Sequence, residues 1–213
     1  MRLMDLQTAR QWGFRRAVWA RVMRLVRPWL VLVRVNVRDI YSDIEVAESE
    51  NGISIREPSP NELLAASSEH PNQLSPTFVN DALTRHDFCV AAFDGSRMIG
   101  WVWGSVDKAP HDEGLAVQVN PPYLYGYKGY TAPEYRGRRI WARIAELRNK
   151  IGAERGCSRF VGFVESHNHA AIQANKRLGN RLVGYAGYIK FFGKSYPFRT
   201  PGVVKHTFRY CRA

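Results

Sequence analysis

A basic, glycine-containing turn is the clearest chemical feature of the sequence. Residues 133–138, Pro-Glu-Tyr-Arg-Gly-Arg, stand just before a segment with helical periodicity. The first N–H groups of a helix lack partners within the helix, and the helix dipole makes that end positive. Arg136, Arg138 and Arg139 add charge, and Gly137 lets the backbone approach a ligand closely. The turn is therefore predicted to bind phosphate groups.

Two groups that can accept a proton follow the apolar segment 159–164. Glu165 is our first candidate for a general base, and His167 is the second. The alternative for Glu165 is a surface carboxylate at the end of a strand. For His167 and its neighbour His169 the alternative is a polar contact in a loop or at a helix start.

Tyrosines recur at every second position from Tyr123 to Tyr127. Tyr125 and Tyr127 are candidates for a general acid, and together with Tyr123 and Tyr130 they are candidates for the lining of an acceptor pocket. The alternative is ordinary, because a tyrosine stripe of period two is also one packed face of a strand.

The elements that must position these residues can be read from periodicity and caps. Ser59-Pro60-Asn61-Glu62 has capping-box spacing and predicts a helix start. Asn168 is the expected cap of a helix that ends at Leu178, before Gly179. The other expected elements are a strand at 53–56, a helix from about 75, a hairpin over 88–103, a strand at 123–127, a helix from 139 to 152, a strand at 159–164, and closing strands within 181–192 and 203–210.

This order of elements resembles the GNAT superfamily of acyl-CoA N-acyltransferases, over residues 53–210. The best-matched pieces are the turn at 133–138, Asn168-His169-Ala170-Ala171-Ile172, and Arg177-Leu178-Gly179. The resemblance implies an α/β (α+β) fold with a central mixed, mostly antiparallel sheet flanked by helices. It also implies transfer of an acyl group from acetyl-CoA or another acyl-CoA to the primary amine of a small molecule.

In that family the amides of the turn bind the CoA pyrophosphate, and the asparagine near the next helix start contacts the pantetheine. By position, the resemblance assigns donor binding to the turn, its flanks and the following helix. These residues are Thr131, Ala132, Arg136, Gly137, Arg138, Arg139, Ile140, Trp141, Asn168 and Asn175.

The sequence departs from the family pattern at four positions. Arg139 replaces a glycine, and Trp141 replaces a glycine or alanine. Asn175 stands where a tyrosine often protonates the leaving thiolate, and Asn180 replaces an aromatic residue. These changes favour a catalytically inactive binding or membrane-associated module as an alternative. A second alternative is an acyltransferase that uses an acyl carrier protein, whose acidic surface would suit this basic chain.

The positive charge is concentrated at the N-terminus. Of a formal net charge of +12, residues 1–38 supply +8, from nine arginines and Asp5. We expect residues 1–50 to form an extension, with a helix from Thr8 to Arg27 and a strand at 31–38, and residues 51–213 to form the acyltransferase domain. One arc of that helix carries Arg10, Arg16, Arg21, Arg24 and Arg27; the other carries Phe14, Val18, Trp19, Val22, Met23, Leu25 and Val26.

Three partners of that apolar arc remain open: the domain itself, a second copy in a homodimer, or an anionic membrane surface. Nucleic acid is disfavoured, because the arginines come without a recognition motif.

Three dispersed cysteines without metal-ligand spacing predict no metal and a reducing compartment. Because the apolar runs are too short to span a bilayer, we expect a cytoplasmic protein, with peripheral attachment to the inner face of the membrane as an option.

Overall fold

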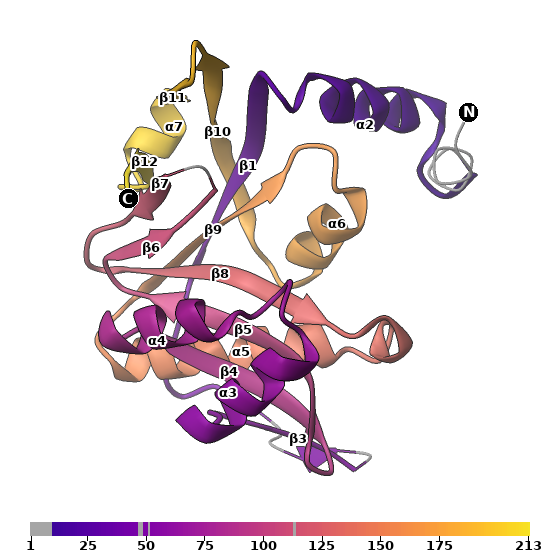
Figure 1. Cartoon of the computed structure of the whole chain (residues 1–213), viewed down its shortest axis with the longest axis vertical. Helices are drawn as coiled ribbons and strands as arrows, with labels where there is room; N and C mark the ends of the chain where they lie inside the picture. The colour runs from indigo at the N-terminus through magenta and orange to yellow at the C-terminus, as the bar shows by residue number, and fades with distance from the viewer. Residues whose placement is uncertain (1–9, 47–48, 51, 113) are drawn as a thin grey trace. The chain divides into compact units, whose positions relative to one another are not determined.

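The computed structural model describes residues 10–46, 49–50, 52–112 and 114–213. The chain divides into two compact units, whose helices and strands are labelled in Figure 1. The central unit comprises residues 39–109 and 119–160. The terminal unit comprises residues 1–38, 110–118 and 161–213. The expected fold class is confirmed, since the chain is a mixed α/β protein with a mostly antiparallel sheet flanked by helices.

The central unit is built on antiparallel strands in the order β8-β5-β4-β3-β2. Their bounds are β2 Ser49–Glu50, β3 Ile53–Arg56, β4 Phe88–Asp94, β5 Arg97–Ser105 and β8 Tyr123–Thr131. The predicted strand at 53–56 and hairpin at 88–103 are confirmed. The short strand β6, Lys108–Pro110, leads out of this unit.

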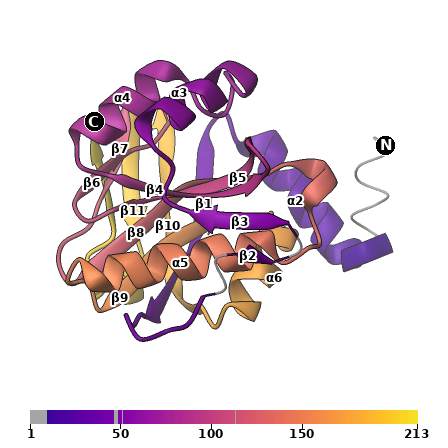
Figure 2. The ribbon, with the colours of Figure 1, turned by 90° about the horizontal axis from the view of Figure 1, so that it is seen from below.

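Helices cover both faces of these strands. Helices α3, Pro60–Glu69, and α4, Pro76–Thr84, lie on one face, and α5, Ile140–Glu154, lies on the other (Figure 2). Ile140 and Ile144 of α5 are buried in one cluster with the strand residues. The burial of this apolar stripe against the sheet fixes α5, and with it the position of the turn that precedes the helix.

Local caps start α3 and α4 where the sequence predicts them. The Glu62 N–H donates to Ser59 Oγ at 3.3 Å, and the Ser59 N–H donates to Glu62 Oε2 at 2.8 Å. This is the reciprocal capping box that the spacing indicates. In α4 the Phe78 N–H donates to Ser75 Oγ at 3.2 Å. Both predicted helix starts are confirmed.

The terminal unit contains a three-stranded antiparallel ladder in the order β11-β10-β1. The predicted strand at 31–38 is β1, Leu30–Asp39, which pairs with β10, Arg181–Phe191. Strand β11, Lys194–Arg199, returns beside β10. Strand β9, Arg159–Glu165, enters this unit at Val161 and leads to helix α6, His169–Arg177.

Two predicted elements are wrong in their bounds. The helix expected from Thr8 to Arg27 is interrupted at Gly13, whose φ of 89° is incompatible with helix continuation, so that α2 spans Phe14–Val26. Residues 8 and 9 lie outside the described part of the chain. The strand expected within 203–210 is instead helix α7, Pro201–Val204, followed by β12, Arg209–Arg212. Thr200-Pro201-Gly202 starts a helix because proline suits a first helical position.

Strand β12 pairs antiparallel with β7, Leu115–Gln118, at the edge of the terminal unit. Strands β7 and β11 have no counterpart among the expected elements, whereas β12 overlaps the end of the closing strand expected within 203–210. Each is short, and β11 directly follows the Phe192-Gly193 turn of a hairpin with β10. Such short strands give weak periodicity in the sequence, which is why the pattern did not indicate them.

Helix α2 packs through Met23 of the expected apolar arc and through two alanines outside that arc. Ala17, Ala20 and Met23 are its buried residues, whereas Phe14 is 76% exposed and Leu25 is 63% exposed. Within the expected apolar arc, Met23 is buried and Trp19 contacts the Ser166 carbonyl, whereas most of the remaining arc faces solvent and its partner stays a prediction. In the part of the chain that the structure describes, no helix is both long enough and apolar enough to cross a bilayer.

Candidate functional site

The basic turn is held in place by the tip of the β4–β5 hairpin, within the central unit. The turn begins with a 3-10 helix, Pro133–Tyr135. The Tyr135 hydroxyl donates to Asp94 Oδ2 at 2.5 Å, and Arg97 Nη2 lies 3.1 Å from Glu134 Oε1. The bond to Asp94 raises the pKa of the Tyr135 hydroxyl. Asp94 and Arg97 of the hairpin therefore anchor residues 133–135, which lead into the basic turn.

The cationic groups of this turn are exposed. Arg136, Gly137, Arg138 and Arg139 are all accessible to solvent. Arg136 is fixed from behind, since its Nε donates to the Thr131 carbonyl at 3.1 Å. The Arg138 guanidinium lies 5.2 Å from the centre of the Tyr135 ring, within reach of a cation–π interaction.

Arg139 caps α5 in a conformation that normally belongs to glycine. Its φ and ψ are 59° and 8°, the left-handed helical region, and its side chain makes no capping hydrogen bond. Left-handed conformations cost a non-glycine residue about 1–2 kcal/mol. The first turn of α5 closes through the Arg143 N–H to the Arg139 carbonyl at 3.2 Å. The backbone thus keeps the shape of a glycine turn although an arginine occupies it.

The two residues after the cap lie inside the central unit. Ile140 is buried in the core, and Trp141 is half-buried against the same cluster. The Trp141 ring occupies the space beside Gly129 of β8, so closely that a β-carbon on Gly129 would overlap with it. On the other side of the turn, Ala132 is buried, and its N–H donates to the Ile99 carbonyl at 2.8 Å.

The tyrosine stripe of β8 faces the interior. Tyr125 and Tyr127 are buried and stack in parallel, with ring centres 5.6 Å apart. The Tyr127 hydroxyl donates to buried Asp87 at 2.8 Å, and Arg85 Nη2 lies 3.0 Å from the same carboxylate. Burial raises the pKa of Tyr125 and of Tyr127, and it raises the pKa of Asp87 against the pull of its hydrogen bonds. This arrangement is that of a packed strand face, and a role of either tyrosine as a general acid stays a prediction.

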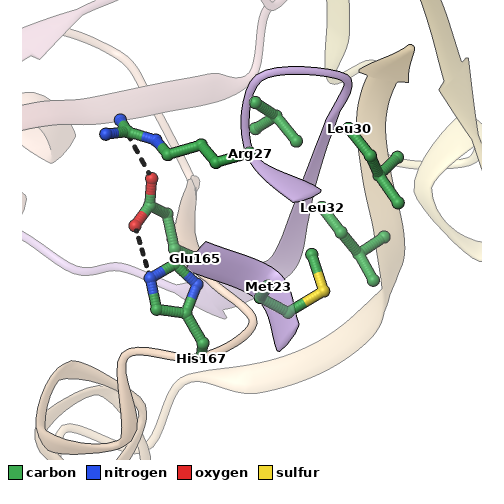
Figure 3. Close-up of a pocket in the computed structure, with 7 residues that line it drawn as sticks. Met23, Arg27, Leu30, Leu32, Glu165 and His167 are labelled. Atoms are coloured by element: carbon green, nitrogen blue, oxygen red, sulfur yellow. Dashed lines mark ion pairs between the residues drawn. The ribbon is translucent and has the colours of Figure 1, made fainter. Parts of the chain in front are cut away.

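Glu165 and His167 line a small pocket of the terminal unit together with the end of α2. Glu165 Oε1 lies 3.4 Å from Arg27 Nη2, and Glu165 Oε2 lies 3.2 Å from His167 Nε2 (Figure 3). The remaining lining is apolar and consists of Met23, Leu30, Val31 and Leu32. Burial lowers the pKa of His167, Glu165 opposes that effect, and Arg24, Arg27 and His169 add to it. The imidazole is therefore held in its neutral form, in which one nitrogen can accept a proton.

Asn168 and Asn175 are both engaged within α6. Asn168 Oδ1 accepts the Ala171 N–H at 3.1 Å, so the predicted helix cap is confirmed. Asn175 Nδ2 donates to the Ala171 carbonyl at 3.0 Å, and its Oδ1 accepts from Asn180 Nδ2 at 2.7 Å. The amide at the position of the family's tyrosine is thus part of a local hydrogen-bond chain.

The sequence did not indicate that α2 borders the pocket of Glu165. Trp19 Nε1 donates to the Ser166 carbonyl at 3.3 Å, and His169 Nε2 lies 3.2 Å from the Arg16 carbonyl. No sequence signal indicates these contacts, because each joins a side chain to a backbone carbonyl about 150 residues away. Within the described residues, no group of three or more histidine, cysteine, aspartate or glutamate side chains is arranged to hold a metal ion.

The chain is an α/β protein with a mostly antiparallel sheet and an arginine-rich turn at the start of helix α5. The sequence model of the acetyltransferase (GNAT) family matches residues 54–180. That match covers more than half of the chain, and the chain belongs to this family. None of the curated protein sequences compared with the chain matches it.

Solved structures share the fold at low sequence identity. A Drosophila protein aligns with a TM-score of 0.55 and 16% identity, over 85% of this chain and 58% of its own. A GCN5-related N-acetyltransferase from Kribbella flavida aligns with a TM-score of 0.50 and 13% identity, over 76% of this chain and 59% of its own. This chain thus spans less than two thirds of the length of these two relatives.

Proposed function

We propose that the protein is an N-acyltransferase that moves an acyl group from acyl-CoA, acetyl-CoA included, to the primary amine of a small molecule. One observation carries the donor half of this proposal. Arg139 holds the start of α5 in a glycine-like conformation without a side-chain cap, between exposed arginines, in a chain of the GNAT family. Backbone strain of this kind persists where the surrounding structure enforces it, which is common at ligand sites.

The turn suits a diphosphate for electrostatic and geometric reasons. The uncapped first N–H groups of α5 can donate to phosphate oxygens, and the helix dipole favours negative charge there. Arg138 and Arg139 are exposed and can form charge-assisted hydrogen bonds with the same oxygens. Arg136 can contribute its remaining N–H groups, because only its Nε is used to hold the Thr131 carbonyl.

The chemical step requires a proton acceptor for the amine. The amine nitrogen attacks the thioester carbonyl carbon, the C–S bond breaks, and the products are an amide and CoA with a free thiol. We assign the amine proton to Glu165, supported by neutral His167 at 3.2 Å from its carboxylate. Because the amide of Asn175 cannot supply a proton, the leaving thiolate takes its proton from solvent.

Donor binding can be tested by calorimetry with CoA. The double variant Arg138→Gln/Arg139→Gln is expected to weaken binding by about tenfold or more, since charge-assisted bonds contribute about 1.5–3 kcal/mol each. The matched control, Arg212→Gln, removes an exposed arginine of β12 and should bind CoA normally. Equal affinity in the double variant and the control would refute the assignment of the turn.

Turnover is measured separately, by thiol release from acetyl-CoA, long-chain acyl-CoA and an acylated carrier protein, over a panel of amines. The three native cysteines are free, so a blank without amine corrects for them. Amine-dependent thiol release from an acyl-CoA confirms the proposed function. If thiol is released from the acylated carrier protein only, the acyl donor is a carrier protein and not acyl-CoA.

A binding module without catalysis is the second candidate. The observation in its favour is Asn175, which occupies the family's acid position and is tied to Ala171 and Asn180. That candidate predicts CoA binding with no thiol release from any donor and amine tested. The two experiments together therefore separate an enzyme from a binding module.

A further inference from the structure

Helix α2 presents an unbroken apolar stripe to solvent. Phe14, Val18, Val22 and Leu25 recur at helical spacing, and each is more than 40% exposed. Trp29, just past the end of the helix, continues the stripe and is 63% exposed. A stripe of large apolar side chains that a protein leaves in water marks an interaction surface.

A second exposed apolar group adjoins the end of this stripe. The Lys190 N–H donates to the Trp29 carbonyl at 2.7 Å, and Leu30 pairs with Ile189. The tip of the β10–β11 hairpin follows directly, and its Phe192 is 88% exposed. Helix α2 and this hairpin tip lie at the same end of the terminal unit (Figure 1). We name the combined surface the apolar end; it consists of Phe14, Val18, Val22, Leu25, Trp29, Ile189, Phe191 and Phe192.

The terminal unit offers few carboxylates to its many cationic side chains. The terminal unit contains eighteen arginines and lysines but only four acidic residues, a net charge of +14. Two of those four, Asp112 and Glu165, lie within 4.0 Å of Arg27, at 3.8 Å and 3.4 Å. Arg27 pairs with these carboxylates at the surface, Ala17 and Ala20 are buried, and the other face of α2 is exposed.

We propose that the apolar end inserts into the interfacial region of an anionic lipid bilayer. The residues at 14–29 and 189–199 include arginines and lysines but no aspartate or glutamate. Arg15 is exposed on α2 beside the stripe, and Lys194 is exposed on the hairpin. Aromatic and aliphatic side chains with cationic neighbours are the combination that interfacial helices use, with apolar burial and attraction to anionic headgroups acting together.

A second copy of the chain fits this surface less well. A twofold contact would bring the same arginines of both copies together. With no carboxylate in either segment, that contact would gain apolar burial at the cost of like-charge repulsion, whereas an anionic bilayer supplies the missing negative charge.

The test is co-sedimentation of the full chain with vesicles of neutral phosphatidylcholine, with and without about 30 mol% phosphatidylglycerol. Binding is expected to the anionic vesicles only and to weaken several-fold between about 0.05 and 0.5 M salt. The variant Phe14→Ser/Leu25→Ser/Trp29→Ser should lose at least about tenfold in the partition coefficient. The variant Arg15→Gln/Lys194→Gln should lose part of the salt-sensitive binding only.

The matched control is Tyr41→Ser/Leu64→Ser/Val106→Ser, which removes three exposed apolar side chains of the central unit and should partition as the native chain does. Retention of CoA binding by both triple variants shows that they are folded. Absence of binding to either vesicle, or equal binding by the native chain and the α2 variant, overturns the proposal. The proposal is also overturned if the native chain is a dimer that does not bind vesicles and the variant Phe14→Ser/Leu25→Ser/Trp29→Ser is a monomer. That result would assign the surface to a second copy of the chain.

Discussion

The indole of Trp141 lies against the backbone of Gly129, so that helix α5 and strand β8 meet where only glycine fits. In the GNAT family a glycine or alanine stands at the position of Trp141. The large side chain of Trp141 on α5 fits here because Gly129 on β8 has no side chain. The turn remains open because the ring lies over β8 and the arginines remain exposed.

The first prediction concerns this pair. Gly129→Ala is expected to destabilise the protein by about 1–3 kcal/mol, because its β-carbon would overlap with the indole of Trp141. In Trp141→Ala the same glycine substitution should cost much less, which a double-mutant cycle from urea unfolding would detect. Additive free energies of unfolding would show that the two residues are not coupled.

The second prediction separates strain from ligand binding at Arg139. Arg139→Gly is expected to raise the free energy of unfolding by roughly 0.5–1 kcal/mol, since relief of the left-handed strain exceeds the added flexibility of the unfolded chain. The same change should weaken CoA binding by calorimetry, because a guanidinium is lost. Arg139→Lys, which keeps both charge and strain, is the control. If Arg139→Gly had the stability and the CoA affinity of the native chain, Arg139 would be neither strained nor a CoA ligand.

Residues near one another in sequence made most of the fold predictable. Ser59 and Glu62 form their capping box, and Asn168 caps α6, because capping depends on residues three positions apart. The support of the turn by Asp94 and Arg97 could not be predicted, since it joins positions about forty residues apart. The orientation of α2 was missed for a different reason. Periodicity identifies an apolar face, but the face that turns inward depends on contacts with distant residues, such as the bond from Trp19 to the Ser166 carbonyl.

The third prediction tests the buried Asp87–Tyr127 pair. Tyr127→Phe removes the hydroxyl that donates to Asp87 at 2.8 Å and leaves a buried carboxylate short of one donor. The expected loss is about 1–3 kcal/mol in the free energy of unfolding. Tyr41→Phe, at an exposed tyrosine, should change stability little. If Tyr127→Phe were as stable as that control, the hydrogen bond would contribute nothing net.

The fourth prediction is a pH dependence of stability that originates at His167. Burial lowers its pKa in the folded state, while Glu165 opposes this and Arg24, Arg27 and His169 reinforce it. As pH falls through the ordinary histidine range near 6.5, the unfolded chain takes up a proton that folded His167 resists, so stability is lost. His167→Asn should reduce the loss of unfolding free energy between pH 7.5 and about pH 5.5.

His86→Asn is the control for that measurement, because His86 is exposed and its φ of 61° suits asparagine. The control should keep the native slope of unfolding free energy against pH. An equal slope in native chain, His167→Asn and His86→Asn would place the acid sensitivity elsewhere.

The fifth prediction addresses the proton acceptor. Glu165→Gln keeps the shape of the side chain but removes the carboxylate that faces Arg27 and His167. If Glu165 takes the amine proton, kcat should fall by about 10²–10⁴-fold while the affinity for CoA is unchanged, because general-base catalysis contributes that much. Raising the pH should then recover part of the rate, since a larger fraction of the amine is deprotonated before it attacks. Glu154→Gln, at an exposed position of α5, should leave kcat unchanged. A Glu165→Gln variant with native kcat would assign the carboxylate to the ion pair with Arg27 alone and leave neutral His167 as the base to test next.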